Sequence, residues 1–294
     1  MHTREVALCV QGAKAAVHVL VSTPAPTRGS GKVGNPQEPF VALLLHGAGC
    51  DGASGGNMDA YAAALCARGG CVAVVRPHMR GTSVPARART ARGVLALART
   101  KLLGGKRARY VLAGHSMGAR VAAALVAAHD ARTAGDDAAE EAVPQHVGEL
   151  SAALLLSFPA TNGKDLSKVR TEPAGITRTR TAFVRGTADA MASDAKFDGL
   201  YASVRTPHKV RLDVPGGGHD LGMKGDPRAK CLAEAKLEAA LDFVLGGGEE
   251  LRGAPTAIGA ATHAAKPTGT KRARSSPSAR PSVAAKRSKS KWDE

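Results

Sequence analysis

Ser116 lies in the stretch RYVLAGHSMGARVAAALVAA, residues 109 to 128. An apolar run reaches Gly114, the serine follows two residues later, and an alanine-rich segment begins at Gly118. A serine held in a tight turn between a buried strand and a helix presents its hydroxyl at the edge of a sheet, where flanking glycines let the two backbones approach. The pattern predicts a nucleophilic hydroxyl. Its plain alternative is an ordinary strand–turn–helix corner that contains a serine.

The same five-residue pattern occurs a second time, at residues 52–56, around Ser54. That serine lies in a glycine-rich loop, and no apolar run leads directly into the first glycine of its pattern. Because a nucleophile elbow needs a strand before it and a helix after it, the context favours Ser116 and predicts that Ser54 is a loop residue.

A serine needs a neighbouring base, and two later segments supply the partners. Asp189 follows the apolar run TAFVRG, and His219 lies in the glycine-rich loop of VRLDVPGGGHD. The order serine, acid, histidine predicts that His219 takes the proton of Ser116 while Asp189 orients the imidazole. The plain alternatives are a capping or turn aspartate and a surface-loop histidine. Three other acids compete for the role of the acid: Asp194 and Asp198 in the next predicted helix, and Asp220 beside the histidine.

Two backbone N–H groups are predicted to stabilise an oxyanion at this site. The N–H of Met117 opens the helix after the serine, and the N–H of Ala48 lies in the loop that follows FVALLLHGAG. In that loop His46 is expected to hydrogen-bond the backbone. His115, inside the elbow, is expected to pack or hydrogen-bond locally.

The elements that position these residues follow from the hydropathy pattern. Two strands, paired as an edge hairpin, are predicted within residues 5–22. Further strands are predicted at 40–49, 71–81, 109–114, 150–159, 181–186 and 209–214, and helices at 57–68, 87–103, from Gly118, 194–204 and 227–245. The acidic segment from Asp130 to Glu149 is predicted to be a solvated excursion, and residues 160–180 a polar, basic crossover.

Strands that alternate with helices imply βαβ units and an α/β fold, with a mostly parallel central sheet and helices on both faces. Aromatic residues make up 3% of the chain, so the core must be aliphatic. One domain is predicted for residues 1–250.

Residues 251–294 differ from the rest in composition, with ten Lys and Arg against two acids, half of the net charge of +16. Their apolar periodicity is too weak for a core, which predicts a disordered basic tail. The clusters KRAR at 271–274 and KRSKSK at 286–291 resemble a bipartite nuclear-import signal. The predicted partner is an import receptor, or nucleic acid bound nonspecifically through charge. The alternative is a solvated basic tail that carries no import signal.

The five cysteines are odd in number and form no C-x-x-C pair, which predicts reduced thiols rather than disulfides or a zinc site. No apolar run reaches 18 residues, and the N-terminus does not read as a secretory signal, so no membrane span or leader is expected. The pattern predicts an intracellular protein, nuclear or cytoplasmic, with no cofactor and no metal.

The segments LLLHGAG, VVRPHMRG, AGHSMGAR, SFP, FVRGTADAM and GGGHDLGMKG, in this order, resemble one α/β-hydrolase-like family. It is the family of the third subunit of the NSL histone-acetyltransferase complex and its small testis-expressed relative, near the dienelactone hydrolases. The resemblance covers about residues 40–246. It implies an α/β-hydrolase fold with Ser116, Asp189 and His219 at the triad positions, and it leaves both catalysis and a scaffold role open.

Two functions therefore compete. The first is a serine hydrolase that acts on a small ester, thioester or amide through an acyl-enzyme. The second is a non-catalytic interaction subunit, nuclear or chromatin-associated, that uses the fold as a scaffold. Direct recognition of nucleic acid rests on charge alone, because the tail has a single aromatic residue, Trp292, for base stacking.

Overall fold

The computed structural model describes residues 1–8, 10, 17–25, 39–48, 57–105, 109–135, 149–162 and 165–246. The chain divides into two units, Met1–Gly247 and Gly248–Glu294. The predicted basic tail at 251–294 with its two clusters lies outside the described residues, as do Ser54 and the acidic residues between 136 and 148.

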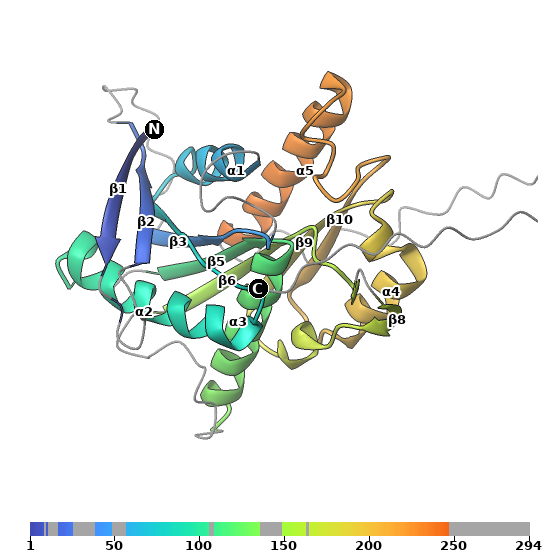
Figure 1. Cartoon of the computed structure of the whole chain (residues 1–294), viewed down its shortest axis with the longest axis horizontal. Coiled ribbons are helices and arrows are strands. Elements are labelled where there is room, and N and C mark those ends of the chain that lie inside the picture. Colours follow the sequence, from blue (N-terminus) through green and yellow to red (C-terminus); the bar gives the residue numbers. More distant parts are fainter. Residues whose placement is uncertain are drawn as a thin grey trace, which may run out of the picture. The chain divides into compact units, whose positions relative to one another are not determined.

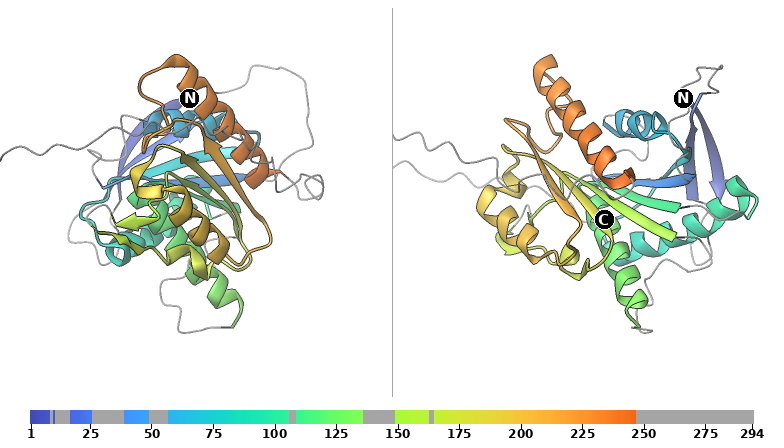
Figure 2. Two further views of the ribbon diagram at one scale, coloured as in Figure 1. Left: turned by 90° about the vertical axis from the view of Figure 1, so that its right-hand side faces the viewer. Right: turned by 180° about the vertical axis from the view of Figure 1, so that it is seen from behind.

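An eight-stranded sheet forms the centre of the first unit (Figures 1 and 2). Its six inner and late strands are parallel, while the first two are antiparallel and form the predicted edge hairpin. In spatial order the strands are β1 (His2–Leu8), β2 (Val17–Thr23), β4 (Cys71–Pro77), β3 (Phe40–Leu45), β5 (Arg109–His115), β6 (Glu149–Leu156), β9 (Arg180–Gly186) and β10 (Lys209–Val214).

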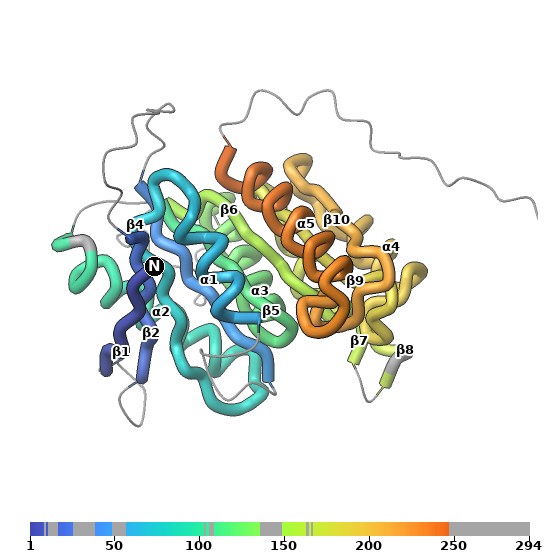
Figure 3. The backbone as a smooth tube through the Cα atoms, turned by 90° about the horizontal axis from the view of Figure 1, so that it is seen from above, coloured from blue at the N-terminus to red at the C-terminus, as the bar shows by residue number. Residues whose placement is uncertain are grey.

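Helices cover both faces of the sheet, as the sequence predicts. One face packs against α1 (Asn57–Cys66) and α5 (Pro227–Leu245), which lie in front of the sheet in Figure 3. The other face packs against α2 (Val84–Leu103), α3 (Met117–Thr133) and α4 (Asp194–Ser203). All six residues of β3 are buried, and alternate side chains enter the two cores, which is why this strand reads as an unbroken apolar run.

The segment predicted as a plain crossover, residues 160–180, contains additional structure. A short hairpin, β7 (Thr161–Asn162) and β8 (Asp165–Val169), is followed by the 3₁₀ helix η2 (Glu172–Gly175). These strands are short and mostly polar, so they lack the alternation by which longer strands are predicted.

Asp130 corrects the prediction that the acidic segment is solvated from its first residue. It lies in the last turn of α3, and only 1% of its surface is exposed. Its carboxylate accepts the backbone N–H groups of Thr177, Arg178 and Thr179 at 2.7–3.1 Å, and the Thr179 hydroxyl at 2.6 Å. The side chain thus anchors the segment that leads from η2 into β9.

Replacement of this anchor is expected to destabilise the fold. Asp130→Ala leaves three backbone N–H groups and one hydroxyl without their acceptor in a buried place, so we expect a loss of about 3 kcal/mol in the free energy of unfolding by urea titration. Asp226→Ala is the matched control: this exposed carboxylate accepts one N–H, from Arg228, at the start of α5, and its removal should cost about 1 kcal/mol. Equal losses in the two variants would contradict the anchoring role.

The sequence predicts reduced cysteines, no metal site and no membrane span, and the structure describes part of the residues that these predictions concern. Cys66, Cys71 and Cys231 are free thiols, as predicted, while Cys9 and Cys50 fall outside the described residues. In the described part of the chain, His, Cys, Asp and Glu form no group of three that could hold a metal ion. Among its helices, none is both long and apolar enough to cross a membrane.

Candidate active site

The sheet topology brings three separated loops to one edge. The neighbouring strands β5, β6, β9 and β10 pair in parallel in this order. The carboxyl ends of β5, β9 and β10 therefore meet at the same edge of the sheet. Ser116 follows β5, Asp189 follows β9, and His219 follows β10.

The side chains of these three predicted residues form one chain of hydrogen bonds. The Nε2 atom of His219 lies 2.8 Å from the Oγ atom of Ser116. Its Nδ1 atom lies 2.7 Å from an oxygen of Asp189, whose side chain is buried. With the ring proton on Nδ1 donated to the carboxylate, Nε2 is free to accept the serine proton, which is the arrangement of a general base and its orienting acid.

The backbone at Ser116 has the strained form of a nucleophile elbow. Its φ of 54° and ψ of −117° are rare for a residue with a side chain, and its N–H donates to the carbonyl of Leu156 at 3.0 Å. Gly118 allows the turn, because a Cβ atom there would lie 2.0 Å from the carbonyl oxygen of Leu45. The second glycine of the pattern is thus needed for the close approach of α3 to β3.

The two predicted oxyanion donors lie near this elbow. Met117 is the first residue of α3, so its N–H is outside the intrahelical ladder and at the positive end of the helix. Ala48 follows β3, which pairs in parallel with β5 so that Leu45 lies opposite Gly114. The part of both N–H groups in binding an oxyanion stays a prediction.

A buried network fixes the loop that carries Ala48. His46 donates from Nδ1 to the carbonyl of Gly47 at 2.7 Å and accepts the N–H of Met79 at Nε2 at 2.9 Å, as expected of a loop-bonding histidine. Burial lowers the pKa of His46, which favours this neutral form. Arg87, which the sequence indicates only as part of a basic helix, donates to the carbonyls of His46 and Met79 and so joins the loops after β3 and β4.

Asp189 combines both roles that the sequence leaves open for it. One oxygen accepts the N–H of Met191 at 2.9 Å and caps the 3₁₀ helix η3 (Ala190–Ala192), while the other faces His219. The three competing acids are engaged elsewhere: Asp194 with Arg185, Asp198 with Arg211, and Asp220 with the N–H of Gly222.

The acid loop and the histidine loop are in direct backbone contact. The N–H of Ala188 donates to the carbonyl of Gly217 at 2.9 Å, and a Cβ atom at Gly186 would lie 2.0 Å from that same oxygen. This contact fixes the separation between Asp189 and His219, since each lies within three residues of it.

Two residues hold the backbone of the histidine loop. His115 donates from Nε2 to the carbonyl of His219 at 3.0 Å, and Asn57, at the start of α1, donates to the carbonyl of Asp220 at 2.8 Å. The sequence predicts a local contact for His115, and this is wrong for its hydrogen bond. The bond joins the elbow to a loop more than 100 residues away along the chain. Burial lowers the pKa of His115 to about 4, which keeps the ring neutral beside His219.

The burial of His115 predicts a pH dependence of stability. Its pKa of about 4 lies below the ordinary value of 6.5, so the unfolded chain binds this proton more readily and stability falls as pH drops from 6.5 toward 4. His115→Phe removes this titration, and the fall should become shallower by up to about 1.4 kcal/mol per pH unit. Urea unfolding at several pH values measures both slopes, and parallel curves for the two proteins would contradict the prediction.

Comparison with known proteins adds the family and the fold. Residues 38–243 match the family model described as alpha/beta hydrolase domain. No curated protein matches the sequence.

Among solved structures, a dienelactone hydrolase from Anabaena variabilis is similar at a TM-score of 0.57 and 13% identity, over 83% of this chain and 99% of the other. Est1E from Butyrivibrio proteoclasticus is similar at 0.55 and 14%, over 82% and 98%. Esterase 2 of Thermogutta terrifontis, in a structure of the enzyme phosphorylated by paraoxon, is similar at 0.55 and 16%, over 82% and 93%. At identities this low, the structural similarity shows a shared α/β-hydrolase fold alone.

Proposed function

The chain belongs to the alpha/beta hydrolase domain family, and on this basis we propose that it is a serine hydrolase. It cleaves a small ester, thioester or amide through an acyl-enzyme. The observation that carries the proposal is the chain of hydrogen bonds from Ser116 through His219 to the buried carboxylate of Asp189. The alternative, a scaffold without catalysis, gives no reason to keep these three side chains aligned.

In the proposed reaction, the Oγ atom of Ser116 attacks the carbonyl carbon while Nε2 of His219 accepts its proton. The N–H groups of Met117 and Ala48 stabilise the oxyanion, and Asp189 stabilises the imidazolium. The imidazolium then protonates the leaving group as the bond to it breaks. Water, deprotonated by His219, attacks the acyl-enzyme in the second half, which releases the acid and restores the serine.

An esterase and a dienelactone hydrolase among the similar structures support ester cleavage as the reaction class. One of them, the Thermogutta esterase, is phosphorylated by paraoxon. We propose that a serine of this chain reacts with organophosphates in the same way.

Hydrolysis of 4-nitrophenyl butyrate tests the proposal. The wild-type protein should release nitrophenolate with saturation kinetics, and Ser116→Ala should lose about 10⁶-fold in kcat, because among the described residues the Ser116 hydroxyl is the one bonded to Nε2 of His219. A folded Ser116→Ala variant that keeps the wild-type rate would assign the activity elsewhere. A folded wild type without activity toward 4-nitrophenyl esters and thioesters would favour the scaffold.

A finer placement rests on the motifs AGHSMGAR, FVRGTADAM and GGGHDLGMKG, which resemble the family of the NSL third subunit and its testis-expressed relative. In addition to this placement, we propose that the basic clusters at 271–274 and 286–291 direct nuclear import through an import receptor. Deletion of residues 266–294 from a fluorescent fusion should abolish nuclear accumulation in cells. An unchanged distribution would contradict the import signal.

A further inference from the structure

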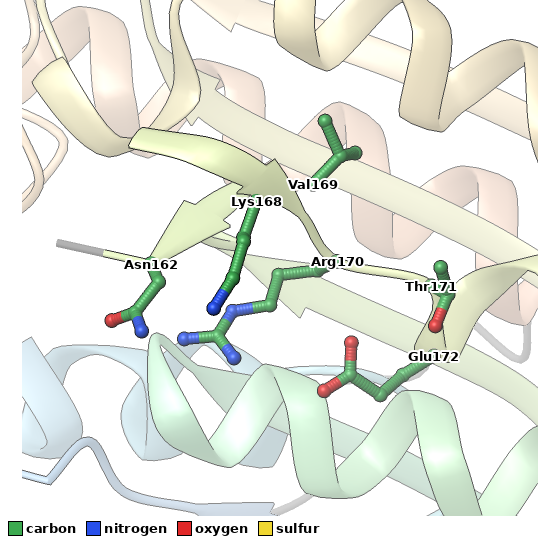
Figure 4. A pocket seen from close by; sticks show the side chains of 6 residues that line it. All are labelled: Asn162, Lys168, Val169, Arg170, Thr171 and Glu172. Atoms are coloured by element: carbon green, nitrogen blue, oxygen red, sulfur yellow. The ribbon is translucent and has the colours of Figure 1, made fainter. Parts of the chain in front are cut away.

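A cavity of about 310 Å³ lies over the segment that joins the β7–β8 hairpin to η2. It is lined by Asn162, Lys168, Val169, Arg170, Thr171 and Glu172. Figure 4 shows the side chains of Asn162, Lys168 and Arg170 pointing toward one another, with Glu172 beyond Arg170. Three of the six lining residues are therefore charged, and two of these are cations.

The contacts along α3 place this cavity near the nucleophile. The segment that contains η2 runs parallel to the helix: Thr179 bonds Asp130, and a Cβ atom at Gly175 would lie 2.7 Å from the Cβ of Ala127. One step further along the same line, Glu172 binds Arg120 in the first turn of α3. Glu172, at one end of the cavity lining, is thus bound to the first turn of the helix that follows Ser116.

Two other contacts connect the cavity with the candidate active site. The guanidinium of Arg120 donates to the sulfur of Met117 at 3.6 Å while it holds Glu172 at 2.8 Å. On the other side of the hairpin, the hydroxyl of Thr161 donates to the carbonyl of Met191, in η3 directly after Asp189. The hairpin thus contacts the acid loop, while η2, which follows the hairpin, contacts α3.

The charges of the described residues around the cavity do not balance. The cations Arg120, Lys168 and Arg170 face two carboxylates: Glu172, which Arg120 binds, and Asp165, which lies 3.5 Å from Lys168. The cation left in excess is Arg170, whose Nε atom is buried and has no hydrogen-bond partner in the described part of the chain. Burial and the nearby Arg120 lower the pKa of Arg170, and the carboxylate of Glu172, which Arg120 binds, opposes this only in part.

We propose that this cavity binds a carboxylate at the far end of the acyl group, so that the preferred substrate is the half-ester or half-thioester of a dicarboxylic acid. The inference rests on the proposed serine hydrolase. A guanidinium binds a carboxylate through two parallel N–H donors, and the amide of Asn162 and the ammonium of Lys168 lie in the same cavity. One excess positive charge matches a carboxylate rather than a phosphate dianion, and Val169, 42% exposed, offers an apolar contact for a methylene chain.

Two chromogenic esters with the same six-carbon acyl chain test the inference. The wild type should hydrolyse mono-(4-nitrophenyl) adipate with a kcat/KM about 10-fold or more above that for 4-nitrophenyl hexanoate. Arg170→Gln should lower kcat/KM for the adipate ester about 10- to 100-fold, mainly through KM, and leave the hexanoate ester within about twofold. Arg178→Gln, an exposed arginine that does not line the cavity, is the matched control and should change neither value.

The outcomes separate this inference from the proposed function. Hydrolysis of both esters with equal kcat/KM, or an equal loss for both in Arg170→Gln, overturns the carboxylate site and leaves the hydrolase intact. Failure of the folded wild type with both esters overturns both proposals. Glutarate should inhibit hydrolysis of the hexanoate ester more strongly than inorganic phosphate at the same concentration, and the reverse order would contradict the assignment to a carboxylate.

Discussion

His219→Ala is expected to lower kcat for a 4-nitrophenyl ester by about 10⁶-fold while the protein stays folded. The imidazole is the one base within hydrogen-bond distance of the Ser116 hydroxyl among the described residues, and without it the hydroxyl stays protonated and unreactive. The ring is partly exposed, so its loss leaves no buried cavity of note, and the free energy of unfolding should change little.

Asp189→Asn is expected to cost less, about 10⁴-fold, because it removes the charge that stabilises the imidazolium, and its amide NH2 donates to Nδ1, which favours the tautomer with the proton on Nε2. The amide can still accept the N–H of Met191, so the cap of η3 should survive. Asp198→Asn serves as the matched control, since this exposed carboxylate pairs with Arg211 away from the histidine, and its activity should equal that of the wild type. We therefore predict that the loss of kcat is largest in His219→Ala, smaller in Asp189→Asn and absent in Asp198→Asn. A loss in Asp198→Asn as large as in Asp189→Asn would show that the acid is wrongly assigned.

Gly118→Ala is expected to cost at least about 3 kcal/mol of folding stability and to remove activity. The added methyl group would lie 2.0 Å from the carbonyl oxygen of Leu45 and 2.9 Å from that of His46. Both atoms belong to the backbone at the end of a fully buried central strand, which cannot move aside as a flexible side chain could. The helix must shift instead, which displaces the N–H of Met117 and the hydroxyl of Ser116.

Gly199→Ala is the matched control for this effect. Gly199 lies inside α4, and no heavy atom comes within 4 Å of the added Cβ apart from its own helix and chain neighbours. Because alanine favours a helix over glycine, the control should be neutral or more stable by up to about 1 kcal/mol. Thermal and urea unfolding compare the two variants. If Gly118→Ala were as stable as Gly199→Ala, the close approach of α3 to β3 would be refuted.

The long elements could be predicted because their patterns reflect what they bury. FVALLL at 40–45 is apolar at every position because both faces of β3 are covered, and the helix after Ser116 is rich in alanine because it packs closely on the sheet. The order of Ser116, Asp189 and His219 after three strands was enough to predict their meeting, since parallel strands end at one edge.

The supports of the site could not be predicted in the same way. Arg87 and Asn57 bind backbone carbonyls that are distant along the chain. Because every residue has a backbone carbonyl, the sequence does not indicate which one a side chain binds. Asp130 stands among acids that suggest a solvated segment, yet its partners are N–H groups of residues 177–179. The hairpin at 161–169 is too short and polar to show a period, although three of its residues line the cavity.

The central claim is that Ser116 is an activated nucleophile, and labelling with a fluorophosphonate followed by mass spectrometry tests it most directly. The Oγ atom of the serine should displace fluoride from phosphorus, so that the folded wild type gains the mass of one phosphonyl group. Peptide mapping should place that group on Ser116, and Ser116→Ala should gain no mass. A folded wild type that stays unlabelled, or a label found on Ser54 instead, would contradict the account.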